Sequence, residues 1–284
     1  MEVKYLSFGN LCLKLQLPER LLETEAYEPF FCEEKAADFE ICYSFSKEPI
    51  LLPDSEKKLE RGNRIFCLDG ERCSVYYKAA VPGEYYAVRR YCSGEKGANI
   101  TLSEKAKGRL WARLALNTLG VEELAAQKNA VVFHSSFVEV QKKALLFTGP
   151  CGIGKSTQAR LWSGYRLAPI INGDKTLLYL ENEKVFASGL PFSGSSGISK
   201  NKSMELGTIV QLGKGKENRA FPLSKKQAFL CLLKSSYIPP FFSESVSATL
   251  AEIAEKSKVC SLLCTPDENA VKVLESYIEG ECNT

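Results

Sequence analysis

The chain has 284 residues, 45% of them hydrophobic and 25% charged, which indicates a globular protein long enough for two domains. Its formal net charge of +3, without basic runs interleaved with aromatic residues, argues against a nucleic-acid partner. The start of the chain carries no targeting pattern and no apolar run is long enough to cross a bilayer, so we expect a cytoplasmic protein with no membrane partner.

The eleven cysteines do not indicate a metal site or a disulfide framework. Their number is odd, they are scattered over a long chain, and no CxxC pair occurs. We therefore expect most of them to be reduced and to act as small buried hydrophobic residues.

Residues 1–92 read as short strands separated by turns. A DG pair at Asp69-Gly70 predicts a tight hairpin, and Pro82-Gly83 predicts a second turn. The region is therefore expected to form a β-rich N-terminal domain. The predicted strands are VKYLSF, LCLKLQL, FEICYSF, RIFCL, CSVYYKAAV and YYAVRRYC.

A polar stretch at residues 93–99, SGEKGAN, predicts a linker. Thr101 followed three residues later by Glu104 fits a capping box, and an amphipathic helix is predicted from there through Leu119, with Gly120 as its stop. The second domain is accordingly expected over residues 100–284.

Two β-like runs, Phe137–Val140 and Ala144–Thr148, are separated by only three residues. Such a gap can close a hairpin but cannot hold the crossover that parallel neighbours require. The strand that enters the following glycine-rich segment is therefore predicted to pair antiparallel with its predecessor.

The remaining elements follow from local patterns. Ser224 and Gln227 form another capping box at the start of a helix that runs to about Lys234. The other predictions are a helix over 155–162, a buried strand over 168–173, a hairpin over 175–188 that turns at 181–184, a Gly- and Ser-rich loop over 189–200, helices over 244–256 and 266–278, and a strand over 259–263.

The segment GPCGIGKST, Gly149–Thr157, contains the pattern GxxxxGK[ST] in full, after an apolar strand and before a helix. Its glycines let backbone N–H groups converge on phosphate oxygens, and the helix N-terminus adds a favourable dipole. Lys155 is expected to reach the β and γ phosphates of ATP, and Ser156 to bind Mg²⁺. The alternative is a glycine-rich turn that matches by accident. The residues predicted to bind ATP are Gly149, Cys151, Gly152, Ile153, Gly154, Lys155, Ser156 and Thr157.

Three further residues have both a functional and a structural interpretation. Asp174 follows an apolar run and could serve the metal or the attacking hydroxyl, or could be a turn residue after Asn172-Gly173. His134, the only histidine, lies after an apolar strand, where a structural hydrogen-bonded role is the more common one. Glu139 is either a solvated hairpin residue or a second acid near the phosphates.

The segments HSSFVEVQKKALLFTGPCGIGKSTQARLW and IINGDKTLLYL are similar to the C-terminal domain of HPr kinase/phosphorylase and its HPr-kinase-like relatives, which share a nucleotide core with phosphoenolpyruvate carboxykinase. The likeness runs from about residue 104 to the end, with its specific motifs within 134–180, and is closest to kinase-like proteins of peptide-maturation systems. It implies an α+β fold with a largely antiparallel P-loop core, preceded here by the β-rich domain.

In that family a histidine at the position of His134 lies near the transferred phosphate, and the loop lysine and serine match Lys155 and Ser156. An acidic pair at the end of the next strand serves as base and metal ligand. The resemblance therefore implies His134, Lys155 and Asp174 as catalytic residues, Ser156 and Asp174 as metal ligands, and ATP with Mg²⁺ as the cofactors.

The chain departs from the family at Gly173-Asp174, where two adjacent aspartates are common. One of the two roles of the acidic pair, base or metal ligand, is then lost, or Asp174 carries both, or another residue supplies it, with Glu139 as a candidate. Reverse phosphorylase activity, and HPr as the acceptor, do not follow from the resemblance.

The first functional hypothesis is an ATP-dependent kinase that transfers a phosphoryl group to a hydroxyl, with Ser of a peptide or protein as acceptor. Two alternatives stay open: a small-molecule kinase, and a non-catalytic ATP-binding regulator. Residues 1–92 are expected to recognise the acceptor or to mediate assembly, because the nucleotide motifs all lie later. The oligomeric state stays open.

Overall fold

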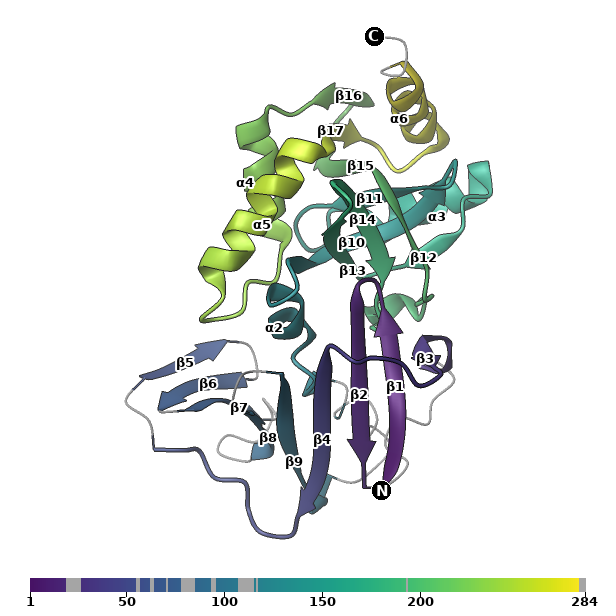
Figure 1. Cartoon of the computed structure of the whole chain (residues 1–284). Helices are drawn as coiled ribbons and strands as arrows, with labels where there is room; N and C mark the ends of the chain where they lie inside the picture. Colours follow the sequence, from purple (N-terminus) through teal and green to yellow (C-terminus); the bar gives the residue numbers. More distant parts are fainter. Residues whose placement is uncertain are drawn as a thin grey trace. The chain divides into compact units, whose positions relative to one another are not determined.

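The computed structural model describes residues 1–18, 27–54, 57–61, 64–69, 71–77, 85–92, 96–106, 115, 117–192 and 194–280. The chain divides into two compact units, one of Met1–Ser7 with Leu11–Val121 and the other of Phe8–Asn10 with Glu122–Thr284. Each unit contains its own sheet (Figure 1), so the chain is a mixed α/β protein.

The first unit is built on a nine-stranded sheet in the order β3-β1-β2-β4-β9-β8-β7-β6-β5. Short 3-10 helices occur at Glu28–Phe30 and Glu104–Ala106. The strands are β1 (Glu2–Phe8), β2 (Leu11–Leu17), β3 (Phe31–Cys32), β4 (Phe39–Ser46), β5 (Lys57–Arg61), β6 (Arg64–Asp69), β7 (Glu71–Tyr77), β8 (Tyr85–Tyr91) and β9 (Gly97–Ser103).

The strands predicted for this region are confirmed as β1, β2, β4, β6, β7 and β8. β6 and β7 pair antiparallel as far as Asp69 and Glu71, as the predicted hairpin requires. Gly70 and the predicted turn at Pro82-Gly83 lie outside the described residues. β3, β5 and β9 were not predicted from the sequence.

β9 corrects two predictions, because it occupies the end of the expected linker and the start of the expected helix. Ile100 is fully buried and Leu102 nearly so, which is the alternation of a strand, and β9 pairs parallel with β4 and antiparallel with β8. Thr101 therefore lies in a strand, where its hydroxyl bonds to that of Ser44, and does not cap a helix. Residues 107–114 of the predicted helix lie outside the described part of the chain.

The second unit is built on an eight-stranded sheet in the order β11-β10-β13-β14-β15-β17-β16, with β12 beside β10. β11 also pairs with β15, so β11, β10, β13, β14 and β15 form a closed ring. The strands are β10 (Ala130–Val140), β11 (Lys143–Thr148), β12 (Ile170–Asn172), β13 (Lys175–Glu181), β14 (Lys184–Gly189), β15 (Ser203–Lys214), β16 (Arg219–Pro222) and β17 (Lys258–Cys264).

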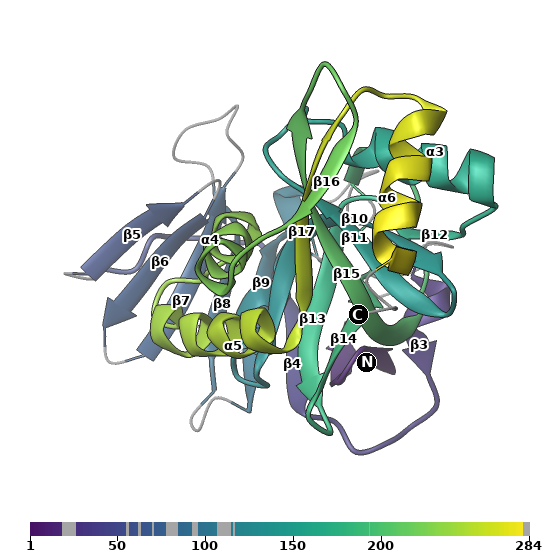
Figure 2. The ribbon, with the colours of Figure 1, turned by 90° about the horizontal axis from the view of Figure 1, so that it is seen from above.

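The helices of this unit cover both faces of the sheet. They are α2 (Val121–Ala126), α3 (Lys155–Arg166), α4 (Lys225–Ser235), α5 (Ser243–Lys256) and α6 (Glu268–Gly280), with a 3-10 turn at Gly194–Ser196. α4 and α5 pack on one side and α3 and α6 on the other (Figure 2). Among the described residues, no helix is long and apolar enough to span a membrane.

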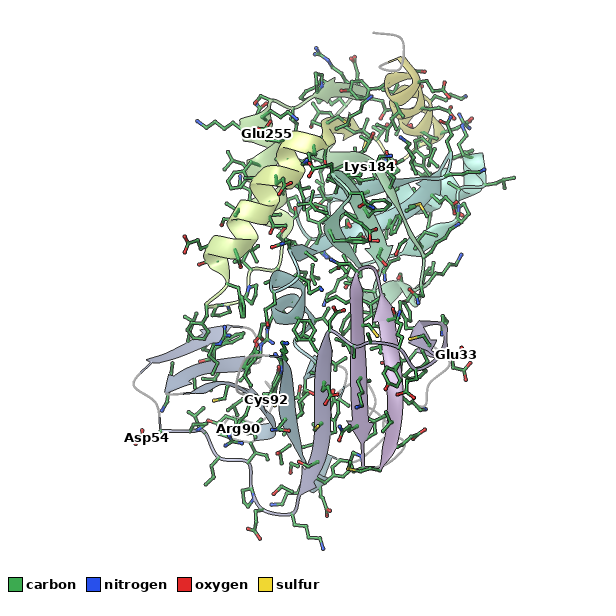
Figure 3. All side chains as sticks on the ribbon, in the orientation of Figure 1. Glu33, Asp54, Arg90, Cys92, Lys184 and Glu255 are labelled. Carbon is green, nitrogen blue, oxygen red and sulfur yellow. The ribbon has the colours of Figure 1, made fainter. Side chains whose placement is uncertain are left out.

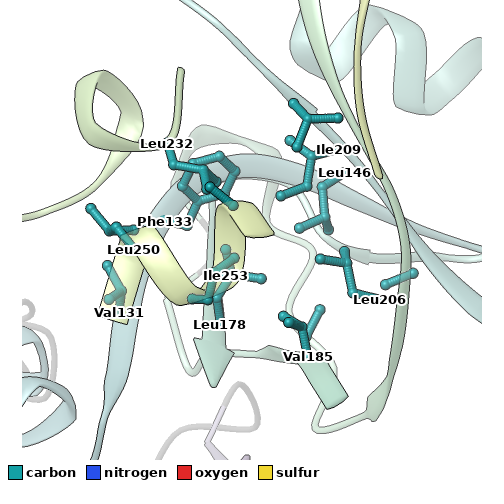
Figure 4. Close-up of a cluster of buried hydrophobic side chains, with 14 of the residues drawn as sticks. Val131, Phe133, Leu146, Leu178, Val185, Leu206, Ile209, Leu232, Leu250 and Ile253 are labelled. Atoms are coloured by element: carbon teal, nitrogen blue, oxygen red, sulfur yellow. The ribbon is translucent and has the colours of Figure 1, made fainter. Parts of the chain in front are cut away.

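Apolar side chains fill the space between the strand ring and the helix pair α4–α5. Phe133 from β10, Leu146 from β11 and Leu178 from β13 meet Leu250 and Ile253 from α5 (Figure 4). All five are fully buried. Charged side chains such as Lys184 and Glu255 lie on the exposed surface of the unit (Figure 3).

The predicted hairpin before the glycine-rich segment is confirmed. β10 and β11 pair antiparallel from Val140↔Lys143 to Ser135↔Thr148. Gln141 and Lys142 have φ values of 49° and 63°, so both turn residues are left-handed, as a type I′ hairpin requires. The hairpin over 175–188 is confirmed as β13–β14, and the later elements as α4 with its Ser224–Gln227 capping box, α5, β17 and α6.

Most strand pairs of the second unit are antiparallel, as the sequence analysis predicted. Two pairs are parallel, β11–β15 and β15–β17. Both involve β15, a strand that the sequence analysis missed together with β16. β11 therefore has an antiparallel neighbour on one side and a parallel neighbour on the other. Both pairings extend to Thr148, where the chain leaves the sheet.

Candidate active site

The glycine-rich loop, Gly149–Gly154, connects the end of β11 to the start of α3. Gly149, Gly152 and Gly154 have φ values of 141°, 74° and 114°, a region that side chains disfavour. A Cβ at Gly152 would meet no heavy atom within 4 Å, so the backbone there faces open space. No side chain caps α3 at Gly154, which leaves the first N–H groups of this helix available to a ligand.

Lys155 is the first residue of α3, and its side chain folds back over the loop. Its Nζ donates hydrogen bonds to the carbonyl oxygens of Gly149 at 3.0 Å and Pro150 at 3.1 Å. Burial lowers the pKa of the Lys155 ammonium, while the nearby Cys151 and Asp174 act in the opposite direction. The positive charge is therefore held inside the curve of the loop.

His134 on β10 and Asp174 before β13 lie in contact. The Nδ1 atom of His134 is 2.9 Å from the backbone oxygen of Asp174 and 3.6 Å from its carboxylate Oδ1. A carbonyl oxygen only accepts, so Nδ1 carries the proton and donates it. Burial, then the charge of Lys155, lowers the pKa of His134, which makes the ring neutral at pH 7 and leaves Nε2 as an acceptor.

Asn172 makes the turn that precedes Asp174. Its Oδ1 accepts from the backbone N–H groups of Asp174 at 2.9 Å and Lys175 at 3.0 Å, and its Nδ2 donates to the carbonyl oxygens of Leu190 and Phe192. Asn172 therefore fills the structural role that was the alternative interpretation of Asp174. The sequence analysis missed it, although an Asn-Gly pair after an apolar run is a signal for a turn of this kind.

Two more residues that sequence reasoning missed lie next to this pair. The Lys175 Nζ is 5.1 Å from the ring centroid of Phe192 and 4.9 Å from that of Tyr237. The Tyr237 ring also meets the His134 ring edge-on at 6.5 Å. Burial, then the charge of Asp174, raises the pKa of Tyr237 to about 12. Tyr237 follows α4, far along the chain, and no local pattern marks it.

A cavity of about 540 Å³ opens beside the start of the glycine loop. Its walls are Gly149–Cys151 of the loop, His134 and Gln211 from the sheet, and Cys231 with Lys234–Tyr237 from the end of α4. Gly149 and Pro150, whose carbonyl oxygens accept from the Lys155 ammonium, are part of this wall. The cavity therefore adjoins the place where the terminal phosphate of a bound triphosphate is expected.

Glu139 is not a second acid near the phosphates. It pairs with Ala144, at the end of the β10–β11 hairpin away from the glycine loop. Its carboxylate instead forms an ion pair with the Lys202 Nζ at 2.5 Å. Glu139 is therefore a hairpin residue, as its alternative interpretation held, but its side chain is partly buried in an ion pair and not freely solvated.

The other predicted site residues differ in their exposure to solvent. Cys151 and Thr157 are exposed, and Ser156 is half-buried in the first turn of α3. Ile153 turns toward the apolar cluster under α3, so only its backbone can serve a ligand. Within the described ranges, no three His, Cys, Asp or Glu side chains gather as a metal site. Mg²⁺ would therefore depend on Ser156, Asp174 and phosphate oxygens.

Acidification is expected to destabilise the wild-type chain more than a His134→Gln variant. The pKa of His134 is lowered on folding, so the unfolded chain binds more protons once the pH falls below about 6.5. The stability that the neutral ring contributes is present above that pH and is lost as the pH falls toward the folded pKa. Urea unfolding at about pH 7.5 and about pH 5.5 measures this. An equal loss in both proteins would contradict it.

No family model matches the chain, and no curated protein matches it. Among solved structures, it is similar to the HPr(Ser) kinase/phosphatase from Coxiella burnetii, with 17% sequence identity over 53% of this chain and 95% of that one, and a TM-score of 0.30. A TM-score this low does not establish a shared fold. The function is therefore argued from the site itself.

Proposed function

We propose that this chain is an ATP-dependent phosphotransferase that moves the γ-phosphoryl group of ATP to a hydroxyl, with a serine of a peptide or protein as the first candidate acceptor. The observation that supports it most is the grouping of three elements in one place. These are a glycine loop that opens into an uncapped helix, a lysine folded over that loop, and the contact between His134 and Asp174.

The loop is suited to bind a triphosphate. Gly152 leaves room where a side chain would otherwise project, and the N–H groups at the start of α3 have no side-chain cap. Helix N-termini and glycine loops of this kind bind phosphate through their backbone N–H groups. Lys155 would exchange its two carbonyl contacts for oxygens of the β and γ phosphates, where its charge offsets the charge that develops during transfer.

Asp174 is the residue placed to receive the acceptor's proton. Its carboxylate is partly exposed, and the turn around it is made by Asn172, so the side chain has no structural duty in that turn. His134 donates Nδ1–H to the backbone oxygen of Asp174, its Nε2 is unprotonated, and the residue is part of the cavity wall. Mg²⁺ held by Ser156 and Asp174 would neutralise phosphate oxygens.

The acceptor is proposed to enter through the cavity beside the loop. At about 540 Å³ it has the size of a small-molecule site, and its wall offers Lys234 and Tyr237 as contacts. A serine side chain on a peptide segment would enter the same cavity. We propose in addition that the first unit recognises the acceptor or mediates assembly, because the proposed nucleotide contacts all come from the second unit.

Lys155→Ala is expected to lower the affinity for Mg²⁺-ATP at least tenfold, because the ammonium lies over the loop and charge-assisted bonds to phosphate are worth about 1.5–3 kcal/mol. Titration calorimetry measures the affinity. Lys142→Ala, in the exposed β10–β11 turn, is the matched control and should bind ATP as the wild type does. Unchanged affinity in Lys155→Ala would refute the phosphate-loop assignment.

The acceptor class can be found with γ-labelled ATP. The purified protein is incubated with labelled ATP and a cell lysate that has been separated by size. Label in the peptide and protein fraction supports the first candidate acceptor, and label in the small-metabolite fraction supports a small-molecule kinase. ATP binding without label in any fraction would favour a non-catalytic regulator.

A further inference from the structure

Ser196 lies against Gly173, the residue directly before the proposed catalytic Asp174. The turn Gly194–Gly197 lies over Gly173 and Asp174. A Cβ built on Gly173 would be 2.2 Å from Ser196 Oγ, which places this hydroxyl at most about 4 Å from the Gly173 Cα. A Cβ built on Gly194 would be 2.7 Å from the Asp174 Cγ, so the turn's backbone rests on the carboxylate side chain.

Both ends of this segment are hydrogen-bonded to residues 171–173, which directly precede Asp174. On the entering side, Asn172 Nδ2 bonds to the carbonyl oxygens of Leu190 and Phe192. On the leaving side, the Gly173 N–H bonds to the Ile198 oxygen, and the Lys200 N–H to the Ile171 oxygen. The turn between these anchors is thereby held at Asp174.

Two glycines shape the arrangement. Gly194 and Gly197 have φ values of 54° and 70°, which lets the chain reverse tightly around Ser196. The Ser196 Oγ accepts a hydrogen bond from the Ile198 N–H at 3.2 Å, which fixes the direction of the side chain. Because position 173 has no side chain, the hydroxyl can occupy the space over Gly173, the neighbour of Asp174 in the chain.

We propose that Ser196 is an acceptor of the γ-phosphoryl group within the same chain, so that the protein phosphorylates itself at this turn. The proposal rests on the proposed ATP-dependent phosphotransferase function. The Ser196 Oγ forms a bond to the γ phosphorus, and the bond from that phosphorus to the β,γ-bridging oxygen breaks, with its electron pair leaving on ADP. The hydroxyl proton passes to the Asp174 carboxylate.

Phosphorylation would also change the site. A phosphate on Ser196 adds a charge of about −1.5 to −2 next to the Asp174 carboxylate. Like charges repel, so the turn is expected to leave Asp174 once Ser196 is modified. The carboxylate would then be open to an acceptor that enters from solution.

The test incubates the full-length protein with Mg²⁺-ATP and locates phosphate by peptide mapping with mass spectrometry. The expected result is one phosphate at Ser196, absent in Ser196→Ala and retained in Ser199→Ala, a control in the same segment whose hydroxyl bonds to the Leu190 oxygen. The initial rate per molecule should stay constant over a roughly tenfold range of protein concentration, because the reaction is unimolecular.

Two further variants examine the geometry. Gly173→Ala places a methyl group 2.2 Å from the hydroxyl and should abolish phosphate at Ser196 while ATP affinity is kept. In a mixture with wild type, an Asp174→Asn chain that carries a tag should stay unmodified, because transfer occurs within one chain. Phosphate on the tagged chain would overturn transfer within the chain.

The outcomes distinguish a failure of this inference from a failure of the proposed phosphotransferase function. If ATP binds in a Lys155-dependent way and label reaches another acceptor, but Ser196 stays unmodified, the self-phosphorylation inference is wrong and the proposed function stands. If ATP does not bind at all, both are wrong. Phosphate at Ser196 that disappears with Asp174→Asn supports both.

Discussion

Asp174→Asn is expected to slow phosphoryl transfer by about 10²–10⁴-fold while ATP binding is kept, which is the usual contribution of a positioned general base. Asparagine has nearly the same size and can keep the backbone contacts to Asn172 and His134. It loses the negative charge that is proposed to orient Mg²⁺ and to accept the hydroxyl proton. The loss should therefore appear in the rate of a single turnover and not in the affinity for ATP.

Glu181→Gln is the matched control for this change, because it removes an exposed carboxylate at the far end of β13 without touching the site. It should transfer phosphate at the wild-type rate. If Asp174→Asn also transfers at that rate, Asp174 is not the base. His134 Nε2 would then be the remaining candidate, since Glu139 is engaged with Lys202 at the other end of the hairpin.

Trp162→Ala is expected to lower the free energy of unfolding by about 3–5 kcal/mol, the usual cost of emptying a large aromatic site. Trp162 on α3 is 1% exposed, and its ring lies 6.5 Å from that of Phe147 on β11. Val210 and Leu262 belong to the same apolar cluster. The tryptophan thus ties the helix that starts at the glycine loop to the strand that ends there.

Urea unfolding measures this effect, and two controls define its cause. Tyr165→Ala, at a half-exposed position of the same helix, should change stability by no more than about 0.5 kcal/mol. Trp162→Phe should cost less than Trp162→Ala, because the indole Nε1–H has no hydrogen-bond partner among the described residues and only ring volume is lost. A cost for Trp162→Ala below about 1 kcal/mol would contradict the packing argument.

Local sequence patterns predicted those parts of the second unit that are determined by residues close together in the chain. The three-residue gap before Ala144 permits only a hairpin, and β10 and β11 form one. The Ser224–Gln227 capping box starts α4 as predicted. The resemblance implied His134 and Asp174 as separate catalytic residues, and their direct contact is a finding of the structure.

The parts that the sequence did not reveal depend on distant neighbours. β15 contains Gly207 and Gly213, which weaken its strand pattern, yet a Cβ at Gly207 would lie 3.1 Å from the Ala144 oxygen and one at Gly213 would lie 2.6 Å from the Leu263 side chain. The glycines are there because neighbouring strands approach closely, which only the folded chain shows. Tyr237 likewise reaches His134 only after α4 has packed on the sheet.

The place of β11 between β10 and β15 sets the order of events during synthesis. A ribosome delivers the chain from its N-terminus at about 5–20 residues per second, so the glycine loop emerges before Ser203–Lys214 has been made. Until β15 arrives, β11 has a partner on one side only, and the ring of strands beneath the loop stays open. The nascent chain should therefore gain the proposed affinity for ATP late, after β15 has closed the ring.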